Sequence, residues 1–203
     1  MSRRRFVGRI AGVGTTGGTR IVVGHWHDTP MGAFSDAMVE TATGHRVLLA
    51  PRPEVADFIA ATYSFDEVRV EAFTVEVTGA GTGSRWQVRS PSLELDLAVG
   101  GPTLLGRLLA LVPRRLATAP AWCALTDPVA RVLLRGVRTR GSAGGGRREY
   151  YGATGVRRIL SASGTWQGAD LGALAPVDPP PRFGFSSTPR RPAVTDVVTT
   201  VLG

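Results

Sequence analysis

Apolar and polar residues alternate along much of the chain, in segments rich in β-branched residues and separated by glycine-rich turns. This alternation is typical of half-buried strands, because successive side chains of a strand point to opposite faces of a sheet. The clearest case is 93–99, where apolar residues alternate with Glu94 and Asp96. The sequence therefore predicts a mainly β (α+β) protein. Further strands are predicted at 20–27, 33–40, 45–49, 68–77, 85–89, 158–167 and 193–202.

Two of these predictions concern how strands connect. Segments 33–40 and 45–49 flank Thr43 and Gly44, and we expect them to pair as a hairpin. In segment 68–77 the apolar residues change phase near its middle, which predicts one long strand with a β-bulge.

Three helical segments are predicted between the strands. Residues 53–63 begin with proline and repeat apolar side chains with helical spacing, as an amphipathic helix does. Residues 102–116 and 120–134 are expected to form a helical hairpin, with the first helix ended by Pro113. Residues 1–18 are expected to form a flexible N-terminal arm.

Composition limits the chemistry available to this chain. With 203 residues, of which 43% are apolar, a single domain with a substantial core is expected. All 24 basic residues are arginine, so reactions that need a side-chain amine are excluded. The net charge of +8 is spread along the chain, as in proteins from GC-rich genomes. A specific nucleic-acid partner is therefore not expected.

Two further features bear on location. Cys123 is the single cysteine and lies in an apolar stretch, which fits a buried thiol in a reducing, cytoplasmic environment. The leucine-rich stretch 104–116 contains arginines and a proline and is too short to span a bilayer. No membrane partner is expected.

Three short motifs have simple structural interpretations. Residues 12–17 match G-x-G-x-x-G, but a strand follows them, so a hairpin turn is favoured over a dinucleotide site. Residues 144–148 favour a mobile surface loop over an anion cradle. His25 and His27 share a strand face but lack a third ligand at a defined spacing. We therefore expect no metal and no cofactor, and predict that the histidines line the rim of a cavity, with Trp26 on the other face.

The run Asp-Thr-Pro-Met-Gly-Ala-Phe-Ser-Asp at 28–36 resembles the D-[ST]-P-x-G-x-Y-x-E stretch of the acetoacetate decarboxylase superfamily. The resemblance places Phe34 at the tyrosine position and Asp36 at the catalytic glutamate position, facing a cavity. Residues 53–65 resemble that family's short helix, and residues 156–174 resemble a late strand, with its motif at 162–168. The resemblance implies an acetoacetate-decarboxylase-like β-barrel, or curved antiparallel sheets around a cavity, with a few peripheral helices. One such domain would span 1–203.

The chain departs from that family at the reacting residue. Where the family carries its Schiff-base lysine after the helix, residues 63–67 read Tyr-Ser-Phe-Asp-Glu, and lysine is absent from the whole sequence. Decarboxylation through a lysine iminium is therefore excluded.

Two classes of function remain. In the first, the protein binds a small organic acid or carbonyl compound, either as a binding protein or as a lysine-independent enzyme of lyase or hydratase type. In the second, it is a non-catalytic interaction or structural β domain, and Asp36 is a satisfied polar residue. A homo-oligomer is left open. The candidate site residues of the first class are Asp36 and His27 as catalytic groups, and Arg46, Phe34, Trp26 and Trp166 as ligand contacts.

Overall fold

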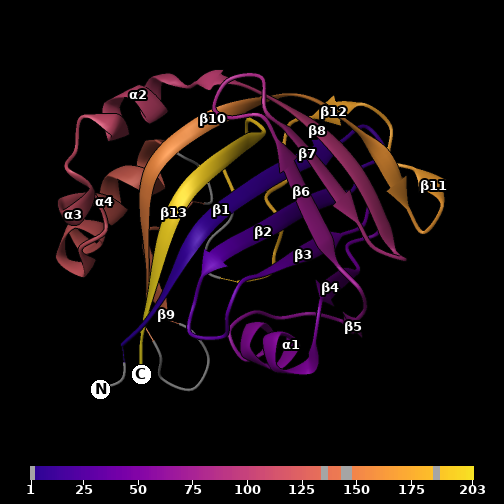
Figure 1. Ribbon diagram of the computed structural model, residues 1–203, viewed down its shortest axis with the longest axis horizontal. Helices are drawn as coiled ribbons and strands as arrows, with labels where there is room; N and C mark the ends of the chain where they lie inside the picture. Colours follow the sequence, from indigo (N-terminus) through magenta and orange to yellow (C-terminus); the bar gives the residue numbers. More distant parts are fainter. Residues whose placement is uncertain (1–2, 134–136, 143–147, 185–187) are drawn as a thin grey trace.

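A computed structural model describes residues 3–133, 137–142, 148–184 and 188–203. The described residues form one curled, mixed sheet that makes a half-barrel, with four helices packed against it (Figure 1). The main path of the sheet runs β5-β4-β3-β2-β1-β13-β10-β8-β7-β6. The strands are β1 Arg3–Thr15, β2 Arg20–Asp28, β3 Phe34–Glu40, β4 Arg46–Ala50, β5 Glu67–Val70, β6 Thr74–Thr78, β7 Arg85–Arg89, β8 Leu93–Pro102, β9 Arg140–Ser142, β10 Arg148–Trp166, β11 Ala169–Asp170, β12 Leu174–Ala175 and β13 Ala193–Leu202. The helices are α1 Pro53–Ala60, α2 Leu104–Ala110, α3 Arg114–Ala117 and α4 Pro120–Leu133.

Most of the predicted elements are present, and the mainly β class is confirmed. β3 and β4 form the predicted antiparallel hairpin, with Val39 opposite Val47. The amphipathic helix begins at Pro53, as predicted. Residues 102–116 form two short helices, because Pro113 ends the first helical segment and precedes α3.

Segment 68–77 is not one bulged strand. It contributes β5 and β6, which lie at opposite ends of the sheet path, and residues 71–73 connect them. The change of apolar phase thus marks the point where the chain passes from one end of the sheet to the other. β5 also pairs in parallel with β4, through the crossover helix α1, so the sheet is mixed rather than wholly antiparallel.

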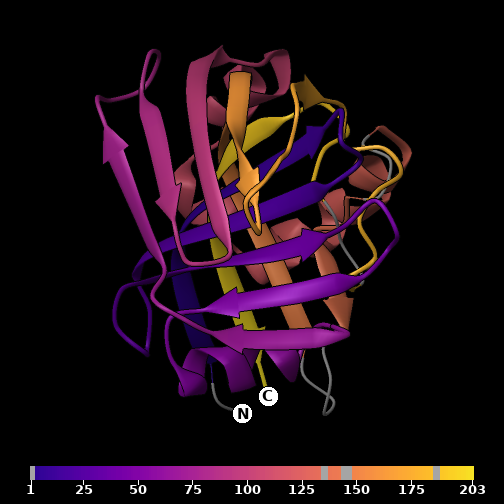
Figure 2. The same ribbon diagram turned by 90° about the vertical axis from the view of Figure 1, so that its right-hand side faces the viewer.

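The N-terminal segment is a strand rather than a flexible arm. β1 pairs with β2 on one side and with β13 on the other, and both described chain ends lie at the same end of the sheet (Figure 2). Gly12 lies inside β1, where a Cβ atom would approach the Thr188 side chain to 2.4 Å. The glycine pattern therefore reflects close packing, and the hairpin turn follows it at residues 16–19.

The two faces of the sheet have different roles. On the inner face, strands from opposite ends of the sheet path pack together, as in the edge-to-face contact of His25 on β2 with Trp86 on β7. This inner core is apolar and filled by Val23, Val39, Val47, Leu49, Trp86, Val88, Leu95, Leu97 and their neighbours. The outer face is covered by α1 and by α2–α4. Helices α2–α4 and strands β6–β8 lie on opposite sides of β10 and β13 (Figure 1). The expected cavity inside the barrel is thus replaced by packed side chains.

Candidate functional site

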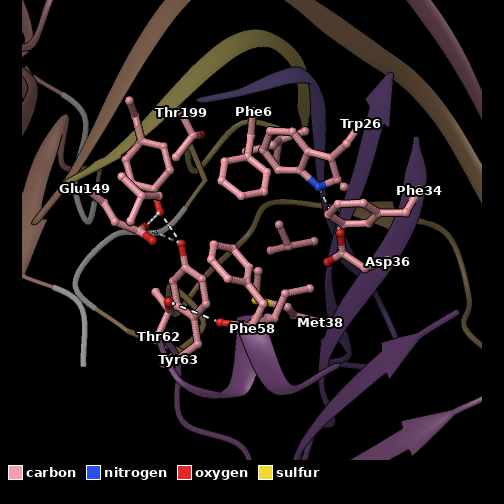
Figure 3. Close-up of a pocket in the computed structure, with 16 residues that line it drawn as sticks. Phe6, Trp26, Phe34, Asp36, Met38, Phe58, Thr62, Tyr63, Glu149 and Thr199 are labelled. Atoms are coloured by element: carbon pink, nitrogen blue, oxygen red, sulfur yellow. Dashed lines mark hydrogen bonds between the residues drawn. The ribbon is translucent and has the colours of Figure 1, made fainter. Parts of the chain in front are cut away.

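Two adjoining cavities lie on the outer face of the sheet. The larger, about 460 Å³, is enclosed by β10, β13, α2 and α4. The smaller, about 60 Å³, lies between β1–β3 and the end of α1 (Figure 3). Both cavities are lined by Ile10, Val22, Met38, Tyr63 and Tyr151. The two cavities are therefore neighbours that share part of their walls.

The larger cavity is mainly apolar. Its walls include leucines of α2, Trp122 of α4 and Val156 of β10. Leu104 and Leu108 line it and are also exposed, so this cavity reaches the surface along α2. Arg138 lies at its wall with Nε 3.2 Å from a carboxylate oxygen of Asp127.

Asp36 lies at one wall of the smaller cavity with only 2% of its surface exposed. In the β2–β3 pairing, Gly24 is opposite Asp36 and Trp26 is opposite Phe34, so Asp36, Trp26 and Phe34 share a face. Trp26 donates a hydrogen bond from Nε1 to Asp36 Oδ1 at 2.9 Å. At Gly24 a Cβ atom would lie 2.4 Å from Asp36 Oδ1, so the glycine leaves room for the carboxyl group.

Burial changes the acidity of Asp36. Loss of solvation disfavours the charged form and raises the pKa from its ordinary value of 3.8 to about 7, although the Trp26 hydrogen bond acts in the opposite direction. A carboxyl group with this pKa can donate a proton or accept one near neutral pH.

A second polar group occupies the opposite wall (Figure 3). Glu149 is 3% exposed, and its Oε2 accepts a hydrogen bond of 2.8 Å from the Tyr151 hydroxyl and one of 3.3 Å from the Tyr63 hydroxyl. The two hydroxyl oxygens also lie within hydrogen-bonding distance of each other. Burial, together with the charge of Glu149, raises the pKa of both tyrosines well above the usual value, so both remain protonated donors. The stacked rings of Phe6 and Phe58 lie between this group and Asp36 (Figure 3).

The prediction that His27 acts together with Asp36 is wrong. His27 is exposed and, one residue after Trp26, points to the other face of β2. His25, on the same face as His27, shares a hydrogen bond of 2.8 Å with Ser35 and faces the inner core. The histidines therefore do not line the rim of either cavity, and Trp26, on the opposite face, does.

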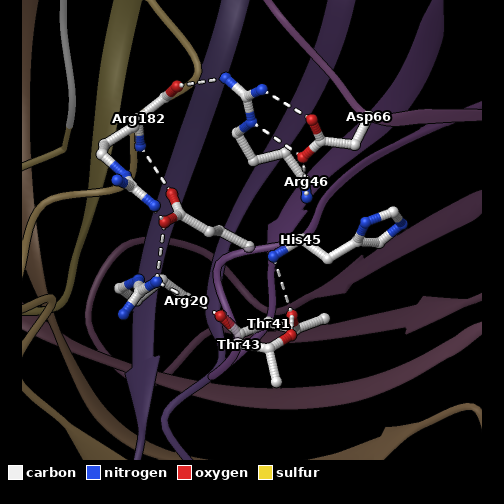
Figure 4. Close-up of polar contacts among 8 residues, drawn as sticks. Arg20, Thr41, Thr43, His45, Arg46, Asp66 and Arg182 are labelled. Carbon is white, nitrogen blue, oxygen red and sulfur yellow. Dashed lines mark hydrogen bonds and ion pairs between the residues drawn. The ribbon is translucent and has the colours of Figure 1, made fainter.

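Arg46 is also separated from Asp36. The strand register places Arg46 opposite Glu40, and its guanidinium binds Asp66 with contacts of 2.7 and 3.0 Å (Figure 4). Trp166 lies at the end of β10, packs against the inner core and holds the Arg69 guanidinium 5.5 Å from its ring centre. Of the six candidate residues, the structure brings together Asp36, Phe34 and Trp26 at the cavity.

Other candidate chemistry has little support in the described part of the chain. It contains no group of three or more His, Cys, Asp or Glu placed to hold a metal ion. Burial raises the pKa of Cys123 to about 11, which disfavours its thiolate. Residues 143–147, most of the loop considered as an anion cradle, lie outside the described residues. No helix among the described residues is long and apolar enough to cross a membrane.

Comparisons with known proteins gave no match to a family model, to a curated protein or to a solved structure. The resemblance to the acetoacetate decarboxylase superfamily therefore stays a prediction.

Proposed function

We propose that the protein binds a small, elongated and largely apolar organic molecule carrying a carbonyl group. The observation that carries this proposal is a large apolar cavity next to a small cavity with buried polar groups. A volume of about 460 Å³ is within the range of small-molecule sites, which are mostly apolar with a few convergent polar groups.

The polar groups favour a carbonyl over a carboxylate. Asp36 and Glu149 both line the smaller cavity, so a ligand carboxylate there would meet acidic groups rather than cations. Protonated Asp36 can instead donate a hydrogen bond to a carbonyl oxygen. The arginine at the wall of the larger cavity, Arg138, is paired with Asp127.

A second candidate is a lysine-independent enzyme acting on the same ligand class. The raised pKa of Asp36 favours it, because a carboxyl group that titrates near neutral pH suits general acid–base catalysis. In such a reaction Asp36 would protonate or deprotonate a carbon or oxygen atom of the ligand.

Filling the larger cavity should abolish binding of an apolar probe. Ala153 lines this cavity, and Ala153→Leu would place extra carbon atoms inside it. We expect N-phenylnaphthylamine, a neutral fluorescent probe, to bind the natural protein and to lose affinity about tenfold or more in the variant. Fluorescence titration measures the affinity of each protein for the probe. A long-chain methyl ketone should displace the probe better than the fatty acid of equal length.

The matched control is Ala121→Leu, which makes the same change at an exposed position of α4 outside the cavity lining. Its probe affinity should equal that of the natural protein. If the natural protein binds neither probe nor ketone, the proposal is wrong and the interaction-domain alternative is favoured. If Ala153→Leu binds the probe as tightly as the natural protein does, the probe binds outside the larger cavity.

A further inference from the structure

We propose that α2 and α3 form a face that docks on an anionic lipid membrane. Four leucines of this region are unusually exposed for large apolar side chains. They form what we call the leucine face: Leu104 at 73%, Leu108 at 55%, Leu111 at 80% and Leu116 at 44% exposed. Exposed apolar side chains gathered in this way mark an interaction surface more often than isolated ones do.

The way α2 packs explains why these leucines remain exposed. Leu104, Leu108 and Leu111 are spaced i, i+4 and i+7, so they lie along one side of the helical segment. Gly106 is buried against β10, where a Cβ atom would lie 2.2 Å from the Val156 carbonyl oxygen. The helix therefore packs on the sheet through its glycine. Its exposed leucines lie at the mouth of the larger cavity and at the surface.

The charge around the leucine face identifies the partner. Arg107, Arg114 and Arg115 are exposed in the same segment. The sequence contains no Asp or Glu from residue 97 to residue 126, so no carboxylate of this region opposes them. Apolar side chains together with arginines are the combination that binds at the interface of a membrane with negatively charged lipids.

A second copy of the chain fits this face less well. Pairing two leucine faces would bring Arg107, Arg114 and Arg115 of one copy close to those of the other, and like charges repel. An anionic bilayer satisfies both the arginines and the leucines. Docking at the surface differs from spanning, so this inference revises the expectation of no membrane partner.

Docking would also place the larger cavity against the bilayer. Leu104 and Leu108 line that cavity and belong to the leucine face, so its mouth lies where the lipid would be. An apolar ligand could then enter from the membrane without passing through water. This step rests on the proposed function, whereas the docking itself does not.

Vesicle co-sedimentation tests the docking directly. We expect the natural protein to sediment with vesicles of phosphatidylcholine mixed with phosphatidylglycerol, and about tenfold less with phosphatidylcholine alone. Leu111→Ser should weaken binding to the mixed vesicles about tenfold, because one exposed leucine no longer enters the interface. Arg114→Gln with Arg115→Gln should remove the preference for anionic lipid.

The control is Val70→Ser, which removes an exposed apolar side chain, 51% exposed, from β5 rather than from α2. It should sediment like the natural protein. The proposal is overturned if the natural protein does not sediment, if Leu111→Ser binds equally well, or if the protein forms a dimer that Leu111→Ser dissociates. Leu111 does not line the cavity, so loss of probe binding in Ala153→Leu and loss of docking in Leu111→Ser report on separate proposals.

Discussion

Replacing Asp36 with asparagine is expected to stabilise the protein at alkaline pH and to leave it little changed in acid. The folded protein holds the Asp36 proton up to about pH 7, whereas the unfolded chain releases it near 3.8. Between these values the folded state binds more protons, so its stability falls as pH rises. The full difference corresponds to roughly 4 kcal/mol, at about 1.4 kcal/mol for each pKa unit. Asparagine does not ionise and avoids this loss, and its amide oxygen can still accept from Trp26.

Urea unfolding of both proteins at about pH 5 and about pH 8 measures the effect. The free energy of unfolding of Asp36→Asn, relative to that of the natural protein, should increase by a few kcal/mol from the lower pH to the higher. Asp66→Asn is the matched control, because Arg46 holds the pKa of Asp66 below its usual value of 3.8. That variant should be less stable than the natural protein by the same amount at both pH values, since the contribution of Asp66 is lost only in stronger acid. An Asp36→Asn advantage that does not change with pH would contradict a buried, raised-pKa carboxyl group.

Replacing Arg20 with methionine is expected to destabilise the fold by about 3 kcal/mol, because the buried carboxylate of Glu40 loses its nearer cation. Glu40 is 1% exposed, and Arg20 Nη2 lies 2.9 Å from its Oε1 (Figure 4). The backbone N–H of Arg182 also donates to Glu40, which ties that segment to β3. Methionine keeps an unbranched apolar side chain but removes this cation, and Glu40 keeps the exposed guanidinium of Arg182, whose Nε lies 3.4 Å from its Oε1.

Arg46→Met makes the same change at a partly exposed ion pair and should cost much less. It should also leave probe binding unchanged, because Arg46 lines neither cavity. Adding Glu40→Gln to Arg20→Met should restore part of the lost stability by removing a buried charge that only the exposed Arg182 would then balance. Urea unfolding compares the variants, and equal losses for Arg20→Met and Arg46→Met would contradict this interpretation.

Local patterns predicted most of the strands, although not β1, and part of the site. Alternation alone placed Phe34 and Asp36 on one face, and both line the smaller cavity. Their partners depend on register between strands, which alternation does not supply. With Trp26 paired to Phe34, Gly24 lies opposite Asp36, and the histidines of β2 necessarily point away. With Arg46 paired to Glu40, the hairpin cannot bring it to Asp36.

The other wall of the site depends on contacts between distant parts of the sequence. Glu149 and Tyr151 lie in the first part of β10, where Gly152 and Gly155 interrupt the apolar pattern, and the strand was predicted only from residue 158. Thr199 comes from β13, which pairs with β10. The larger cavity exists because α2–α4 pack on the outer face, and no local signal in the sequence indicates which face a helix will cover.

The central claim is that the neighbouring cavities on the outer face bind an apolar carbonyl compound. A crystal structure of the protein with a long-chain methyl ketone carrying a terminal bromine tests it most directly, because anomalous scattering locates the bromine. We predict a bromine peak between α2, α4 and β10, with the carbonyl group toward Asp36. A peak at another surface, or no peak from a ketone that displaces the probe in solution, would contradict the claim.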